Sequence, residues 1–340
     1  MTTDQLLQVI QNIVPDSNAD INAWQSVLEK HGTSPSVFHL FNTVEYYVAY
    51  FSKNKSINLS FIIYNNKEPV SAMPLMVHQN EHNEWVLSSN GVEIIEPVFI
   101  PTIARKVKKR LESQLAEMVY ALSSKLGIGC CQFTNMEYSQ LSGWYLMWAE
   151  KACEVFSTHH LLVDLSLPLE EIRLKFRKSF KPLINKSLRE WKVEVHESVS
   201  EEIFDRFKQL HKEVAGRSTR PIESWNEQRK QIGSLESFLV TVADTQGEMV
   251  GAGLFVYSSY QSLYCVGAYK RELFDKPIGH AVQMKAIETL KKNGTLWYEI
   301  GQKHLETDKT PPTEKELSIS HFKQGFSTHV IARQHLVVTI

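Results

Sequence analysis

Hydrophobic and polar positions alternate in two different ways along residues 264–304, and the two patterns predict a strand, a helix and a second strand. Apolar side chains occupy every second position over residues 264–268, which is typical of a half-buried strand. The spacing then becomes helical in a segment that Pro277 introduces and Gly294 ends. The second strand follows at residues 296–300, with polar residues directly after it. A unit of this length predicts a parallel crossover, whose ligands gather at the carboxyl ends of the strands.

The same two periods divide the rest of the chain into further elements. Helices are expected at residues 5–13, 21–31, 103–126, 170–192 and 201–215. Pro182 is expected to break the fourth of these into two. Strands are expected at residues 59–64, 70–77, 85–87, 128–134, 161–165, 237–243 and 249–257. The fold class is therefore α/β (α+β), with mixed sheets flanked by helices and two similar domains in tandem at residues 1–154 and 155–340.

Composition narrows the class of protein. A length of 340 residues favours two domains, and a hydrophobic fraction of 43% supports sizeable cores. No apolar run approaches the ~18 residues of a membrane span, and the N-terminus lacks a basic region before an apolar core. We therefore expect a cytoplasmic protein without a membrane partner. Lysine and arginine (37) balance aspartate and glutamate (38), which argues against a nucleic-acid partner.

Several common sites are excluded by spacing. The four cysteines form no CxxC pair, and the 13 histidines include no HExxH, so no metal site is expected. The chain also lacks GxxxxGK[ST], GxSxG and a GxGxxG placed between a strand and a helix. The commonest kinase, hydrolase and dehydrogenase classes are thereby removed.

Two polar clusters belong to the strand–helix–strand unit. Pro277, Gly279 and His280 open the helix, where unpaired backbone N–H groups suit a pyrophosphate; the alternative is an ordinary loop. The second cluster follows the second strand and contains Glu299, Gln302, Lys303 and His304. A carboxylate or an imidazole there can take the proton of an amine, whereas the alternative is a surface loop.

A third cluster ends an earlier helix. Arg217 and Arg220 lie three residues apart and can hold a phosphate, while Trp225 can stack on a base or sugar. His211 precedes both arginines in the same segment. The alternative is a polar helix end whose arginines form surface salt bridges.

Six segments together resemble the Fem-like tandem GNAT-fold family, typified by the nonribosomal peptidyltransferases of bacterial cell-wall synthesis. They are LVDL (162–165), AGRSTRP (215–221), VGA (266–268), PIGH (277–280), YEIG (298–301) and FKQGF (322–326). In the first half, MPL (73–75) and EPV (96–98) look like the family's N-terminal copy. AGRSTRP and TEKELSISHFKQGF are most similar to the polysaccharide-biosynthesis branch. Its members resemble N-acyltransferases that use acyl-CoA to modify a dTDP-linked amino-deoxysugar, such as dTDP-3-amino-3,6-dideoxy-D-galactose.

The resemblance implies a function and a set of residues. It implies transfer of an acetyl or 3-hydroxybutanoyl group from acyl-CoA, a co-substrate rather than a tightly bound cofactor, during surface polysaccharide (O-antigen or capsule) synthesis. The C-terminal domain would carry the acyl-CoA site. Implied catalytic residues are Glu299, with His304 as its rival, and His211. Implied acyl-CoA contacts are Val266, Gly267, Pro277, Gly279, His280 and Gln283. Implied acceptor contacts are Arg217, Arg220, Trp225, Gln302, Lys303 and Lys323.

Two other functions stay open at this point. One is an aminoacyl-tRNA-dependent Fem-type peptidyltransferase, and the other is a non-catalytic GNAT-fold binding protein. The tRNA-dependent enzymes carry a long helical-hairpin arm, and no heptad-like insertion is evident in this sequence. That departure and the balanced charge favour acyl-CoA as the donor. A homodimer is compatible with each of these readings.

Overall fold

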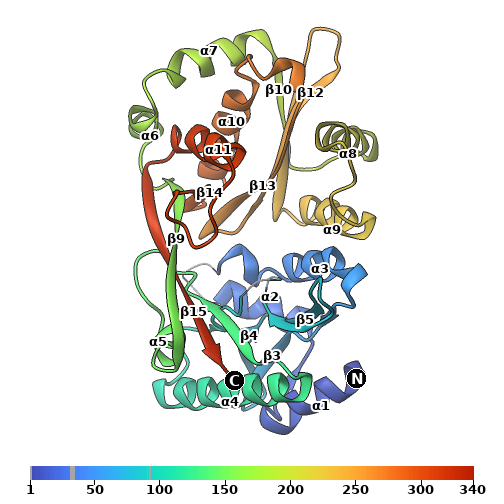
Figure 1. Cartoon of the computed structure of the whole chain (residues 1–340), viewed down its shortest axis with the longest axis vertical. Coiled ribbons are helices and arrows are strands. Elements are labelled where there is room, and N and C mark those ends of the chain that lie inside the picture. Colours follow the sequence, from blue (N-terminus) through green and yellow to red (C-terminus); the bar gives the residue numbers. More distant parts are fainter. Residues whose placement is uncertain (1, 31–34, 90, 92) are drawn as a thin grey trace. The chain divides into compact units, whose positions relative to one another are not determined.

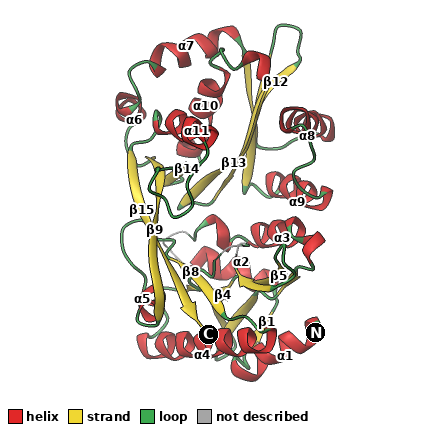
Figure 2. Ribbon diagram, viewed as in Figure 1, coloured by secondary structure: helices red, strands yellow, loops and turns green. Residues whose placement is uncertain are grey.

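The computed structural model describes residues 2–30, 35–89, 91 and 93–340, which form sheets flanked by helices, as expected (Figures 1 and 2). The chain divides into two compact units, Met1–Ser157 with Arg333–Ile340, and Thr158–Ala332. The sequence-based division was at residue 154, with the whole remainder assigned to the second domain. The structure instead returns the final segment to the first unit, because that segment pairs there with another strand.

The first unit contains two small antiparallel sheets and five α-helices among its described residues. The helices are α1 (Thr3–Ile13), α2 (Ile21–Lys30), α3 (Phe41–Tyr50), α4 (Arg105–Leu126) and α5 (Gly143–Ala149). One sheet has the order β1 (Ser17–Asn18), β3 (Phe61–Asn65), β4 (Glu68–Met73) and β7 (Val98–Phe99). The other has the order β2 (Ile57–Asn58), β5 (Met76–Gln79) and β6 (Trp85–Ser88). In addition, β8 (Cys130–Thr134) pairs with the end of β15 (His329–Thr339).

The second unit is built on one larger sheet with helices on both faces. Its strands have the order β10 (Lys192–His196), β11 (Ser237–Ala243), β12 (Met249–Tyr257), β13 (Gln261–Tyr269), β14 (Trp297–Lys303) and the second half of β9 (Ala152–Asp164). Its helices are α6 (Leu169–Lys175), α7 (Phe180–Glu190), α8 (Glu201–Ala215), α9 (Ile222–Gly233), α10 (Ile278–Lys292) and α11 (Glu314–Gln324). Figure 1 shows α8 and α9 on one face of this sheet and α10 and α11 on the other.

The central strand–helix–strand prediction is confirmed, since β13 and β14 pair in parallel and α10 connects them. Two other expectations need correction. The strand expected at 70–77 is two strands, β4 and β5, that flank Pro74. The helix expected at 170–192 breaks before Phe180, and Pro182 lies in the first turn of α7. N–H groups in a first turn have no acceptor within the helix, so proline costs no hydrogen bond there. The helix expected at 21–31 is seen to Lys30, and its last position lies outside the described residues.

Strand β12 is buried on both faces, and its glycines set the distance to α10. A Cβ at Gly253 would lie 2.7 Å from Cγ1 of Val282, and one at Gly251 would lie 2.6 Å from Cγ2 of Ile278. The opposite face of β12 contributes Ala252 and Leu254 to a second core beneath α8 and α9. The sheet is therefore packed tightly on both sides, and α10 is held directly against it.

Adding one methyl group at Gly253 tests this packing. We expect Gly253→Ala to lower the free energy of unfolding by about 1–3 kcal/mol, because the new Cβ overlaps the side chain of Val282. Gly233→Ala is the matched control, since a Cβ there meets nothing within 4 Å. Urea denaturation of both variants measures the difference. Equal stability of the two variants would contradict the tight contact between β12 and α10.

Candidate active site

Strands β13 and β14 pair over only three positions and then diverge. The register runs from Gln261 with Trp297 to Leu263 with Glu299. Beyond that point β13 continues to Tyr269 and β14 to Lys303, without recorded pairing between them in the described residues. The backbone N–H groups on that edge of β13 are thus available to a ligand rather than to a neighbouring strand. We call this feature the strand divergence.

Glu299 lies at the point where the strands diverge, and its carboxylate is buried. The residue is 7% exposed. Its Oε1 is 2.7 Å from Nδ1 of His160, and its Oε2 accepts a hydrogen bond of 3.1 Å from Nε2 of Gln261. The neighbouring Tyr298 donates to Gln283 of α10, so Glu299 points to the opposite face, which α8 and α9 cover.

Lys323 approaches the same point from the other side of the sheet. It belongs to α11, and its Nζ lies 5.4 Å from the centre of the Tyr264 ring. A Cβ at Gly301, whose φ is +152°, would lie 2.5 Å from that nitrogen. Burial lowers the pKa of Lys323, and the negative charge of Glu299 opposes this shift. An acidic and a basic group therefore face the strand divergence from opposite sides.

A cavity of about 940 Å³ lies beside β13, between the start of α10 and α11. Part of its wall is apolar and includes Tyr269, Phe274 and Phe322. The cationic side chains that line it are Arg271, Lys276, Lys315 and Lys323. A cavity with apolar walls and several cations suits a ligand that combines an apolar chain with anionic groups.

The expected acyl-CoA contacts divide into two groups. Gly267, Gly279 and His280 line the cavity. The remaining three lie elsewhere: Val266 is in the core beneath α8, Gln283 is buried against Tyr298, and Pro277 is the N-cap residue of α10. Because β13 alternates its faces, Val266 and Gly267 could not both face one cavity.

His280 sits among aromatic rings at the start of α10. The ring centres of Phe180, Phe322 and Phe326 lie 4.5, 5.1 and 5.8 Å from that of its imidazole. Burial lowers the pKa of His280 to about 4, with a smaller contribution from Arg177. The side chain is therefore neutral at pH 7, and it offers hydrogen bonding without charge to a ligand in the cavity.

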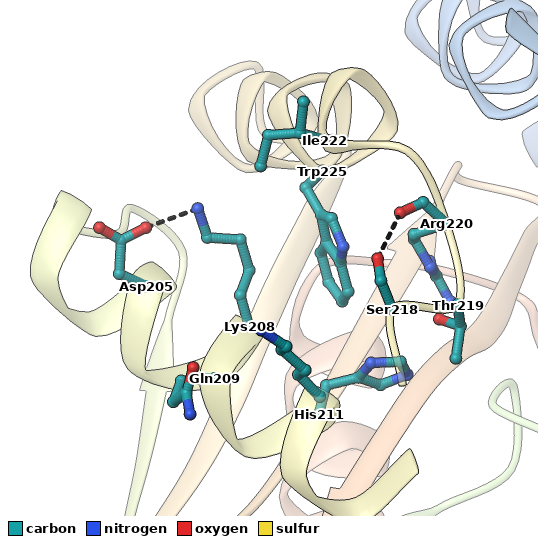
Figure 3. Close-up of a pocket in the computed structure, with 10 residues that line it drawn as sticks. Asp205, Lys208, Gln209, His211, Ser218, Thr219, Arg220, Ile222 and Trp225 are labelled. Carbon is teal, nitrogen blue, oxygen red and sulfur yellow. Dashed lines mark hydrogen bonds and ion pairs between the residues drawn. The ribbon is translucent and has the colours of Figure 1, made fainter. Parts of the chain in front are cut away.

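A second pocket, of about 330 Å³, lies between α8 and the segment that leads into α9 (Figure 3). His211, Arg220 and Trp225 line it, whereas Arg217 does not. The indole of Trp225 is only 6% exposed, because it packs on Phe204 and Phe207 in the core. Trp225 therefore exposes too little surface to stack on a base or sugar, as was expected of it, and it forms part of the pocket wall.

Arg220 and His211 are held in this pocket by the same indole. The guanidinium of Arg220 lies 4.7 Å from the ring centre of Trp225 and donates to Oε1 of Gln228 at 3.3 Å. The His211 ring packs edge-on against Trp225, and the two ring centres are 5.2 Å apart. Burial lowers the pKa of His211, and the charge of Arg220 adds to the effect. The pocket thus offers the cations Lys208, Lys212 and Arg220 together with the imidazole of His211.

The second strand was expected to end at Ile300, and the structure corrects this boundary. Strand β14 continues through Gln302 and Lys303, which pair with β9. His304 follows the strand, and its recorded contacts are with Asp308, at 3.7 Å, and with Ser320, whose hydroxyl accepts its backbone N–H. The hydrogen bonds of Glu299 described above are made with His160 and Gln261.

Sequence patterns missed His160, which contacts Glu299 directly. It lies on β9 beside a second histidine, and the expected strand began one residue later. Its only sequence signal is the alternation with Leu162, which places both side chains on one face. The partner across the sheet is 139 residues away, so local spacing could not show the pair.

Solved structures identify the fold. FemX matches with a TM-score of 0.67 over 94% of this chain and 96% of its own, at 12% identity. L-PGS from Bacillus licheniformis matches with a TM-score of 0.60 over 94% of this chain and 92% of its own, also at 12% identity. No family model and no curated protein matches the chain. The chain therefore has the fold of FemX, and the prediction of a Fem-like fold from sequence is confirmed.

The buried imidazole of His280 predicts a pH-dependent stability. Its pKa is about 4 in the folded chain and 6.5 as the unperturbed value, so between these pH values the unfolded chain binds a proton that the folded chain does not. The free energy of unfolding is therefore highest above pH 6.5. It falls by about 3 kcal/mol as the pH is lowered from 6.5 towards 4.

Denaturation of wild type and His280→Phe at pH 4.5 and 7.5 measures this effect. We expect the loss of unfolding free energy at acidic pH to be smaller in the variant, because phenylalanine cannot titrate. His82→Gln is the control, since that side chain is 73% exposed. An identical loss in wild type and His280→Phe would contradict the assignment.

Proposed function

We propose that the protein is an N-acyltransferase that moves an acyl group from acyl-CoA to the amine of a nucleotide-linked amino sugar. The strand divergence carries the proposal. It has a large cavity with cationic and apolar walls beside it, and Glu299 faces the opposite side. Donor and acceptor can therefore approach one point from two faces of the sheet.

The large cavity supports acyl-CoA as the donor. Its apolar wall suits the pantetheine arm and acyl chain, and Arg271, Lys276 and Lys315 suit the phosphates. The first turn of α10 adds unpaired backbone N–H groups and the positive end of a helix dipole. The arm would extend along β13, past Gly267, so that its thioester reaches the strand divergence.

The residues at that point can perform the transfer. The neutral amine attacks the thioester carbonyl, forming a C–N bond and a tetrahedral oxyanion. Backbone N–H groups of β13 and the ammonium of Lys323 stabilise the oxyanion, and Glu299 takes the proton that the amine gives up. The C–S bond then breaks, and CoA leaves as a thiolate that takes up a proton. Lys323, expected at the acceptor phosphates, is thus reassigned to the reacting carbonyl.

The smaller pocket supports an acceptor that carries phosphate. It lies on the face of the sheet to which Glu299 points, and Arg220 can bind a phosphate oxygen there. Both Arg220 and Glu299 act electrostatically on Cys265 of β13, so the pocket and the base flank one strand residue. A dTDP-amino-deoxysugar such as dTDP-3-amino-3,6-dideoxy-D-galactose rests on the resemblance of AGRSTRP and FKQGF to the polysaccharide branch.

A second candidate function follows from the comparison with FemX. The same fold and the same strand divergence would serve an aminoacyl-tRNA-dependent peptidyltransferase, whose donor is an ester rather than a thioester. The two readings share Glu299 and Lys323 but differ in what fills the large cavity. A ligand-binding protein without catalysis is the remaining alternative.

A cytoplasmic location completes the proposal, since acyl-CoA and nucleotide sugars are cytoplasmic compounds. Among the described residues, no helix combines the length and the apolar character that crossing a bilayer requires. In the same part of the chain, no group of three or more His, Cys, Asp or Glu side chains could hold a metal ion. The proposed chemistry uses neither a lipid anchor nor a metal.

The donor can be identified by measuring thiol release. Purified protein would be incubated with acetyl-CoA or 3-hydroxybutanoyl-CoA and a panel of dTDP-amino sugars, and free CoA thiol would be followed. We expect release only when a sugar with a free amine is present. Transfer from aminoacyl-tRNA without thiol release would support the Fem-type alternative, and tight CoA binding without turnover would support the binding protein.

Replacement of the base gives the second test. We expect Glu299→Gln to reduce kcat at least ~100-fold, because the amide cannot accept the proton, with the Kd for CoA changed little. Glu288→Gln on α10 is the control, since that side chain pairs with Lys285 and lines neither pocket. Near-normal kcat in Glu299→Gln would transfer the role to His211 or His304.

A further inference from the structure

His160 is joined to Glu299 by a short hydrogen bond across two neighbouring strands. In the register of β9 and β14, Glu299 lies opposite Leu162, and His160 lies two residues before Leu162 on the same face. The register shifts between Glu299 and Gly301, which locally bends β14. The separation between Nδ1 of His160 and Oε1 of Glu299 is 2.7 Å, and both side chains are nearly buried, at 12% and 9% exposure.

The partners on either side define the direction of each hydrogen bond. Gln261 donates its amide N–H to Oε2 of Glu299 at 3.1 Å. An ionised carboxylate only accepts hydrogen bonds, so Nδ1 of His160 donates its N–H to Oε1 of Glu299. Nε2 of a neutral His160 is then an acceptor, and the hydroxyl of Thr158, 2.8 Å away, is its donor. With Glu299 ionised and His160 neutral, these contacts correspond to the tautomer that carries its proton on Nδ1.

We propose that His160 is a positioning residue, which holds Glu299 as an oriented carboxylate ready to take the proton of the acceptor amine. The proposal rests on the function proposed above. Two N–H donors, one from β9 and one from β13, fix the plane of the carboxylate and stabilise its charge. Thr158 keeps the donor proton of His160 on Nδ1.

Other ionisable groups near Glu299 come from the elements that pack around it. Lys323 of α11 interacts electrostatically with Glu299 across the strand divergence, and so does Cys265 of β13. His160 is a titratable group in direct contact with the carboxylate, at 2.7 Å, so its removal should change the pH dependence of catalysis.

Two replacements separate positioning from simple packing. His160→Asn keeps an N–H donor close to the place of Nδ1, whereas His160→Phe keeps the bulk and removes the hydrogen bond. We expect His160→Phe to lower kcat ~10–100-fold, with little change in KM for acyl-CoA. The acidic limb of its kcat/KM profile should move up by about one pH unit, because the carboxylate loses a donor. His160→Asn should recover most of kcat and keep the limb of wild type.

Three outcomes would overturn the inference. The first is an acidic limb that does not move in a folded His160→Phe. The second is an equal loss of kcat in His160→Phe and His160→Asn. The third is that adding His160→Phe to Glu299→Gln lowers kcat again by the full factor of the single variant. The third matters because a residue that acts through Glu299 adds little once Glu299 is gone. Thermal unfolding of each variant confirms that the folded state is being measured.

A measurement without substrate keeps the inference separate from the proposed function. Nitrogen-15 spectra of the histidine rings at pH 7.5, assigned with His160→Asn, report the tautomer of His160. We expect the neutral form with the proton on Nδ1, and a proton on Nε2 alone would overturn the inference. Absence of thiol release with every donor and acceptor would count against the proposed acyl transfer, while the tautomer would still test the contact between His160 and Glu299.

Discussion

The divergence of strands β13 and β14 is the constraint on which the candidate site depends. If the two strands paired along their full length, their backbone groups would be consumed by the sheet, and no edge would face a ligand. Divergence after three positions exposes that edge at the centre of the second unit, where helices cover both faces. The cost of unpaired backbone groups is one that a bound substrate can offset. The tight packing of α10 on the glycines of β12 keeps the first turn of that helix beside the exposed edge.

The charges at the divergence follow from this geometry. Glu299 belongs to the strand that separates from β13, and Lys323 reaches the same place from α11. Both groups are largely removed from water, so each affects the other more strongly than surface charges would. A buried carboxylate also needs hydrogen-bond donors, and His160 and Gln261 supply them. Charge, hydrogen bonding and backbone exposure thus converge on one place because the strands separate there.

Much of the fold could be predicted from local patterns, and much of the site could not. The spacing of apolar residues located α8, α10, β11 and β12 closely, because each element presents a regular face to a core. Pro182 was taken as the point where the helix at 170–192 breaks, but a proline in the first turn of a helix does not interrupt it, and the break lies before Phe180. Glu299 was selected as a candidate base because the predicted strand ended beside it, but no sequence pattern pointed to its partner His160. That pairing depends on the register between β9 and β14, which no short window of sequence contains.

The return of the last strand to the first unit has a consequence for how the chain folds. The end of β15 pairs with β8, and His335 and Thr134 are register partners about 200 residues apart in sequence. During synthesis, β8 leaves the ribosome long before its partner exists, and its edge waits unpaired while the whole second unit is made. The first unit is therefore begun first and completed last. Closing so long a loop is slow, and a chain that lacks only its final residues would leave the exposed edge of β8 open to association with other chains.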